Sequence, residues 1–195
     1  MVVHIVFQAL TQSETTEHSE ALLACLPTLE NFSSEYISSL LYRKGTDLSR
    51  GLRLLYSSLE TALALRIIAA KTLTLLQDTA SLKLACHVLK HEQEIDILIP
   101  TLDLVEKLGT SQVSELVFPL LASEAFPVRA YALKVISSFE REKQTDLYLR
   151  FLADPSPWVA KQAAMALLRA GQVDALKSLV KTKHVAADLA EQVLS

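Results

Sequence analysis

His87 and His91 have the spacing in this sequence that best suits a metal ion. Residues four apart lie on the same face of a helix, so both imidazoles can reach one zinc ion. The zinc-protease motif needs a glutamate directly after the first histidine, and Val88 stands there instead. Glu92 or Glu94 is available as a third ligand, but a histidine near a helix C-terminus is explained equally well by the helix dipole. We therefore predict no metal site and no cofactor.

The two cysteines offer little nucleophilic chemistry. Cys86 and His87 are neighbours in the sequence, so on a helix their side chains point about 100° apart. Cys25 and Cys86 both lie in apolar stretches, where cysteine usually packs as a small core residue. Two isolated thiols fit a reducing compartment better than a disulfide framework. The cysteines therefore favour a cytoplasmic location and predict no Cys–His dyad.

Other catalytic patterns are missing from the sequence. It has four glycines and contains no Gly-x-Ser-x-Gly, no P-loop and no dinucleotide-binding loop. Glu92, Glu94 and Asp96 stand together just before an apolar helical stretch, where acidic residues are favoured by the helix dipole alone. We predict that the protein is not an enzyme.

Charge and hydropathy argue against two classes of partner. The formal net charge is −3, and residues 151–195, the most basic part, carry four acids against five bases. A nucleic-acid-binding protein usually has a basic excess or a basic stripe, so nucleic acid is not expected as a partner. No apolar run approaches the roughly 18–20 residues of a membrane span, and the N-terminus lacks the basic start of a signal peptide. We predict no membrane insertion.

One helical pattern recurs along the chain, and we count its offsets from its first apolar residue. In the copy that begins at Val159, apolar or small residues stand at offsets zero, four, five and eight, which form one stripe of a helix. The earlier copies precede it at a near-constant spacing along the sequence. The copies are Leu65, Ala69, Ala70 and Leu73; Ile97, Thr101, Leu102 and Val105; Val128, Ala132, Leu133 and Ile136; Val159, Ala163, Ala164 and Leu167; and, after a shorter step, Val185, Leu189, Ala190 and Val193.

Another apolar helical pattern precedes each copy. Examples are residues 111–121, 145–152 and 172–180. The repeating unit is therefore predicted to be a helical hairpin, and hairpins at this period indicate an all-α solenoid. Small residues at offsets four and five let neighbouring backbones approach closely, whereas a bulky side chain there would overpack the layer.

The turn before the best copy has its own pattern. Asp154 can accept backbone N–H groups, Ser156 is a candidate N-cap, and Gly171 fits the position after the last turn of the helix. Trp158 lies beside this turn, either as an exposed anchor or as a lid packed across adjacent repeats. We favour the lid, because large aromatic side chains are usually buried for the most part.

Residues 154–171, with the pattern D-P-S-P-x-V-x-x-x-A-A-x-A-L-x-x-x-G, resemble a HEAT repeat in its short bacterial form, and residues 123–136 resemble it too. This resemblance implies a right-handed superhelix of stacked hairpins. It also implies a ladder of acid–arginine pairs between repeats, for which Asp154 matches the acid, while Arg66 and Arg129 match the arginine. Leu98 and Ala160 stand at the arginine position of the other copies, so the ladder is expected to be incomplete.

Residues 1–60 lack the repeat pattern and read as three less regular helices. Solenoids need atypical ends that cover the stack. We therefore predict an irregular N-terminal helical cap at residues 1–60 and one continuous domain of HEAT-like repeats at residues 61–195.

In such an array the second helices line a concave face, and offsets two to three, six and ten point outward. We predict that these residues form a ridge, the "predicted ridge", that binds a protein partner, so that the protein is a non-catalytic scaffold or adaptor. Tyr, Met and Arg are enriched at protein interfaces. The predicted ridge consists of Lys71, Asp103, Lys107, Tyr131, Lys134, Lys161, Gln162, Met165 and Arg169.

The sequence leaves open an enzymatic function and self-association. Some HEAT-like proteins are enzymes or enzyme subunits, such as alkylpurine DNA glycosylases and phycobilin lyase subunits. The glycosylase alternative requires a basic groove, which the near-neutral ridge does not favour. The apolar fraction of 50% is high for an open array, because a solenoid buries less surface than a globule of equal length, and it predicts that a partner or self-association covers part of the apolar surface.

Overall fold

The structure is a computed structural model that describes residues 7, 11, 18–29, 32–140, 144–182 and 186–195. In this part of the chain the backbone forms α-helices, short 3-10 helices and turns, and no strand. The predicted all-α class is therefore confirmed. The chain divides into two compact units, residues 1–108 and 109–195. That division does not test the predicted boundary between a cap and the repeats at residue 60, which stays a prediction.

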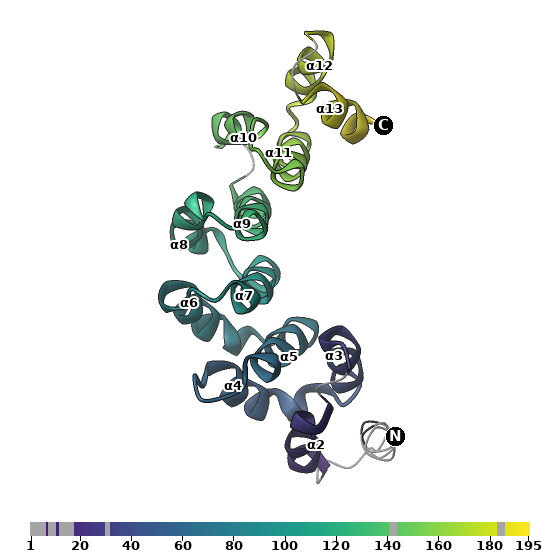
Figure 1. The fold of residues 1–195 in the computed structure, drawn as a ribbon, viewed down its shortest axis with the longest axis vertical. Helices are drawn as coiled ribbons and strands as arrows, with labels where there is room; N and C mark the ends of the chain where they lie inside the picture. Colours follow the sequence, from purple (N-terminus) through teal and green to yellow (C-terminus); the bar gives the residue numbers. More distant parts are fainter. Residues whose placement is uncertain (1–6, 8–10, 12–17, 30–31, 141–143, 183–185) are drawn as a thin grey trace. The chain divides into compact units, whose positions relative to one another are not determined.

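The first unit is built from helices joined by tight turns (Figure 1). They are α2 (Ser19–Cys25), η2 (Leu26–Leu29), α3 (Ser34–Tyr42), η3 (Gly45–Leu48), α4 (Ser49–Ser57), α5 (Leu63–Leu75), η4 (Thr79–Ser81), α6 (Leu82–His91) and α7 (Ile95–Leu108). Helix α4 packs against α5 and α6 packs against α7, so two hairpins follow one another. Helix α5 also packs against α3 and α7, which makes it the central helix of this unit.

The second unit repeats the same arrangement. Its elements are η5 (Ser111–Val113), α8 (Ser114–Val117), η6 (Phe118–Ala122), α9 (Phe126–Phe139), α10 (Thr145–Phe151), α11 (Pro157–Arg169), α12 (Val173–Lys181) and α13 (Ala187–Leu194). The hairpins are α8–α9, α10–α11 and α12–α13, and the second helices pack in the order α9, α11, α13. The predicted stacking of hairpins through their second helices is confirmed within each unit.

Small residues lie where the second helices meet. The six alanines at offsets four and five have no exposed surface, and Thr101, which takes this place in α7, is also fully buried. A side chain of this size leaves room for the backbone of the next helix, as the repeat pattern predicts. The six alanines are Ala69, Ala70, Ala132, Ala163, Ala164 and Ala190.

The ends of α11 follow from its sequence. The Asp154 carboxylate accepts the Ser156 backbone N–H at 2.8 Å, which holds the turn, and Pro157 then begins the helix. Ser156 is the N-cap residue as predicted, although its side chain makes no capping hydrogen bond. After the helix, Gly171 has a φ of 73°, the left-handed conformation that glycine adopts at least cost. This position was predicted correctly.

The prediction of a single helix over residues 111–121 is wrong. The structure divides it into η5, the single turn α8 and η6. Pro119 lies at the beginning of η6 and has no backbone N–H to donate to the carbonyl one turn earlier. The apolar pattern persists through this segment, and Val113, Val117 and Leu121 are buried, so the segment still packs as the first half of a hairpin.

Candidate binding surface

In the second unit the predicted ridge lies on two helices that pack together, α9 and α11. The side chains of Tyr131 and Lys134 on α9 and of Gln162 and Met165 on α11 are half-buried, and Arg169 is exposed. Tyr131 and Gln162 share offset three, and Lys134 and Met165 share offset six. Equal offsets on neighbouring second helices therefore give two rows of partly accessible side chains. Lys161, at offset two of α11, is half-buried as well.

Two contacts position side chains of these rows. The Lys134 ammonium lies 5.6 Å from the centre of the Tyr131 ring, a distance at which a cation is attracted to an aromatic face. On α11, an Arg169 N–H donates to the Ser137 hydroxyl of α9 at 3.1 Å, and Ser137 is buried. The guanidinium of Arg169 therefore also ties α11 to α9.

In the first unit the structure brings fewer ridge residues together. Lys71 on α5 donates to the Ser34 hydroxyl at 2.7 Å and forms an ion pair with Glu35, both on α3. The hydrogen bond from Lys71 lowers the pKa of the Glu35 carboxyl. Asp103 is half-buried and Lys107 is exposed, one turn apart on α7. Lys71 is therefore held by α3, and only Asp103 and Lys107 share a helix there.

Two acid–arginine pairs tie consecutive hairpins together. Arg129 at the beginning of α9 donates two hydrogen bonds, each 2.9 Å long, to the carboxylate of Asp154 in the turn before α11. Arg66 on α5 forms the same two-pronged contact with Glu92, in the turn before α7. We call these contacts the Arg129–Asp154 rung and the Arg66–Glu92 rung.

Glu92 is the residue that the sequence analysis missed. It was interpreted as part of an acidic helix start, whereas its carboxylate pairs with Arg66. The signal was present, because Glu92 stands five residues before Ile97 as Asp154 stands five before Val159. The match to the repeat pattern is not evident, because the acid at this position is Glu rather than Asp.

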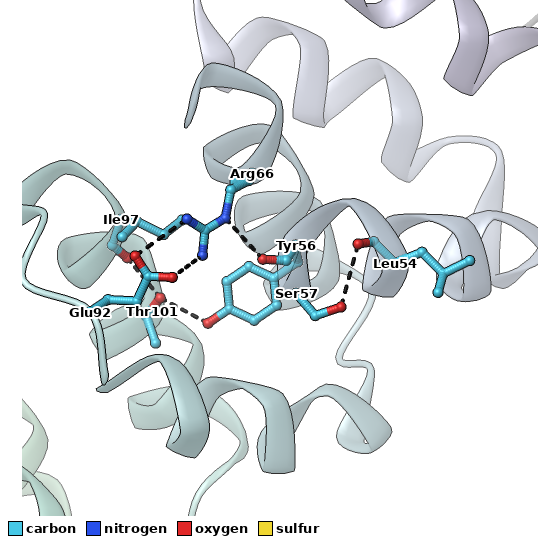
Figure 2. A network of polar contacts seen from close by, with 7 residues as sticks. All are labelled: Leu54, Tyr56, Ser57, Arg66, Glu92, Ile97 and Thr101. Atoms are coloured by element: carbon cyan, nitrogen blue, oxygen red, sulfur yellow. Dashed lines mark hydrogen bonds and ion pairs between the residues drawn. The ribbon is translucent and has the colours of Figure 1, made fainter. Parts of the chain in front are cut away.

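The Arg66–Glu92 rung is part of a buried polar network (Figure 2). Arg66 also donates to the Tyr56 backbone carbonyl at 3.2 Å, and the Tyr56 hydroxyl lies 2.8 Å from that of Thr101. Burial raises the pKa of Tyr56, so its hydroxyl stays neutral. The network joins α4, α5, α7 and the turn before α7. Each of these polar groups has a partner, which is what a buried structural network requires.

Asp154 is electrostatically stabilised in its rung. Burial alone would raise the pKa of its carboxyl, but hydrogen bonds from Arg129 and from the Ser156 N–H outweigh that effect and lower it. The carboxylate is therefore ionised and committed to Arg129. It is not a candidate general acid or base.

The metal and nucleophile candidates remain without support. The His87 and His91 rings are close, 4.4 Å between centres, but Glu92 is engaged by Arg66. Among the described residues no three His, Cys, Asp or Glu side chains come together as a metal site. Cys86 is half-buried, and burial raises the pKa of its thiol, which disfavours the thiolate. No helix of the described part is long and apolar enough to cross a membrane.

The prediction that Trp158 is a buried lid is wrong. Its side chain is 66% exposed at the beginning of α11. The neighbouring Pro157 starts the helix, and the residue after it falls on the side of the first turn opposite the fully buried Ala163 and Leu167. Phe126 occupies a similar place at the beginning of α9 and is 44% exposed.

Comparisons with known proteins agree with this architecture. Residues 113–194 match the family model described as HEAT repeats. Among solved structures, the crystal structure of an engineered protein, a target of the Northeast Structural Genomics Consortium, has a TM-score of 0.52 and 14% sequence identity, and the match covers 96% of this chain and 94% of that chain. At this identity the likeness shows the fold alone. Comparison with curated proteins finds no match. The predicted resemblance to HEAT repeats is thus confirmed for residues 113–194.

Proposed function

We propose that the protein is a non-catalytic scaffold that binds a protein partner through the two rows of partly accessible side chains on α9 and α11. The observation that supports it best is the alignment of Tyr131 and Lys134 with Gln162 and Met165 on two packed helices. These side chains are positioned by the fold yet only half-buried. Tyr and Met suit such a surface because they offer large contact areas with few rotatable polar groups.

A photo-crosslinking residue in place of Gln162 tests the proposal in cells. We expect crosslinks from this position to a protein partner, identified by mass spectrometry. The same residue in place of the exposed Glu115 on α8, the first helix of another hairpin, should give none. Binding of the purified partner should then be lost in the triple variant Tyr131→Ala, Lys134→Glu, Met165→Asp. It should persist in Lys177→Glu, which changes an exposed lysine of α12. Equal crosslinking from both positions would refute the proposal.

The enzyme alternative, self-association and a cytoplasmic location are not part of this proposal. No observation on the described residues favours the glycosylase-like or lyase-like enzyme. The carboxylates of Glu92 and Asp154 are already paired with arginines, so catalytic acids would have to be other residues. Self-association and a cytoplasmic location stay predictions as well. Analytical ultracentrifugation of the purified chain tests the first of these directly, because a sedimentation coefficient that rises with concentration would show self-association.

A further inference from the structure

A shallow groove opens in the first unit between the C-terminal ends of α3 and α5. Its volume is about 610 Å³, and its lining includes Tyr42 and Arg43 from the end of α3 and Leu75 and Gln77 from the end of α5. Tyr42 is 50% exposed and Leu75 is 46% exposed. The groove therefore presents an aromatic ring and a branched aliphatic side chain to solvent, in the same lining as an arginine.

Arg43 is the one charged residue in this lining. Within the part of the chain that the structure describes, its guanidinium has no hydrogen-bond or ion-pair partner, although its backbone N–H caps α3. By contrast, Arg53, Arg66 and Arg129 all pair with an acid. An unpaired, exposed arginine beside apolar side chains is suited to a carboxylate, which it can bind through two parallel hydrogen bonds.

The surrounding sequence is locally basic. Residues 1–60 contain four Lys or Arg residues, and all of them fall between residues 43 and 53, with one acid, Asp47, among them. The rest of residues 1–60 carries the other six of its seven acids and none of its bases. Arg53 pairs with Asp78 and Lys44 is buried, so the exposed positive charge of this stretch comes from Arg43 and Arg50. In a chain of net charge −3 this local positive charge favours an acidic partner at the groove, where Arg43 is the lining residue that carries it.

The backbone fixes both edges of the groove. Gly45 and Gln77 line it, and both have positive φ angles, of 78° and 53°. The N–H groups of Gln77 and Asp78 are bonded to the Thr74 and Leu73 carbonyls, so the end of α5 is held in a closed turn. Little ordering of the backbone would be needed on binding, which lowers the entropic cost of association.

We propose that this groove binds an acidic peptide segment of a protein partner, with an Asp or Glu carboxylate on Arg43 and the adjacent apolar side chain against Tyr42 and Leu75. The inference deepens the proposed scaffold function and rests on it for the class of partner. It places a specific contact in the first unit, apart from the rows of α9 and α11. Leu75 stands at offset ten of α5, as Arg169 does in α11.

The test is an NMR titration of the isotope-labelled full chain with a capped hexapeptide of alternating leucine and glutamate between terminal glycines. We expect chemical-shift changes at Tyr42, Arg43, Thr46 and Gln77, and none with the glutamine counterpart. Arg43→Gln should weaken binding about tenfold, the loss expected for hydrogen bonds to a charged group. Arg50→Gln is the matched control, because Arg50 is exposed on the next helix and does not line the groove, and it should bind as the native chain does.

Other results would overturn the proposal. They are shift changes that map elsewhere, equal binding of the glutamine peptide, native affinity in Arg43→Gln, or the same shifts produced by inorganic phosphate or an RNA hexamer instead of the peptide. If circular dichroism shows that Arg43→Gln does not fold, the variant Thr46→Glu tests the proposal instead. A carboxylate added to the lining should repel the acidic peptide and abolish binding. Peptide shifts confined to α9 and α11 would refute the groove and leave the scaffold function standing. If crosslinking fails at Gln162 while the groove binds the peptide, the binding surface on α9 and α11 is refuted and the groove stands.

Discussion

The Arg129–Asp154 rung should contribute measurably to stability, and Asp154→Asn removes its charge with little change of shape. The side chains of Arg129 and Asp154 are 15% and 7% exposed, which lies between an open surface pair and a fully buried one. Exposed ion pairs are worth at most about 1 kcal/mol, and breaking a buried pair costs about 3–5 kcal/mol. For two charge-assisted hydrogen bonds in a partly buried site we therefore expect a loss of about 2 kcal/mol.

The free energy of unfolding is best measured by urea denaturation, followed by circular dichroism, for the four members of a double-mutant cycle. Those members are the native chain, Arg129→Gln, Asp154→Asn and the double variant. We expect a coupling energy of about 1–2 kcal/mol, because the two side chains contact each other directly. Glu35→Gln serves as the comparison. Its partner Lys71 gives it a similar hydrogen bond, but Glu35 is 72% exposed, so the loss should stay below about 1 kcal/mol.

The pH dependence gives a second, independent readout of the same rung. The folded-state pKa of Asp154 lies below its ordinary value of 3.8, so near that pH the folded chain binds fewer protons than the unfolded chain. The stability that Asp154 contributes is therefore present above that value and is lost as pH falls through the lowered pKa. The difference between the native chain and Asp154→Asn should shrink over this window. A coupling energy near zero, together with a difference that does not change with pH, would refute the reasoning.

Three further predictions concern single sites. Gln77→Gly should stabilise the chain by about 1 kcal/mol in urea denaturation, because Gln77 holds a φ of 53° that glycine adopts without strain, whereas Gly171→Ala, at a φ of 73°, should destabilise it by a similar amount. Ala163→Leu should lower stability by about 1–3 kcal/mol in the same assay, because Ala163 has no exposed surface between packed helices; an unchanged midpoint would contradict close packing there. Trp158 is the one tryptophan of the chain, so its fluorescence should be quenched by acrylamide almost as strongly in the folded as in the urea-unfolded chain, and a strongly protected tryptophan would contradict its 66% exposure.

The sequence predicts the hairpin array well because its signal is repeated. One small residue in one helix says little, but Ala69, Ala132 and Ala163 at equal offsets in three copies are hard to explain except by close packing. The buried state of all three follows from that requirement. The end of α11 is predicted for a similar reason, because glycine is the usual residue for a left-handed position after a helix.

The features that sequence reasoning misses depend on single residues and on the path of the backbone. Gln77 forms the same kind of turn after α5 that Gly171 forms after α11. Glutamine is not a residue type that indicates a positive φ, so the sequence does not predict this turn. The groove between α3 and α5 is formed by two turns whose approach in space no periodicity reveals. Trp158 was misjudged because a rule about average burial was applied to a residue in the first turn of a helix, where one side faces solvent.

The rungs show that a repeat pattern can lack an arginine–acid pair in some copies and still be regular in the others. Arg66 pairs with Glu92 and Arg129 pairs with Asp154, at nearly equal separations along the chain. Leu98 and Ala160 stand at the arginine position of the copies that begin at Ile97 and Val159, so these two copies lack the arginine of a rung. Leu98 is only 5% exposed and Ala160 only 3% exposed, so an arginine at either position would be a desolvated charge unless an acid paired with it. An arginine and its acid must therefore occur together, which is why Arg66 with Glu92 and Arg129 with Asp154 are better evidence for contact between repeats than either residue of a pair alone.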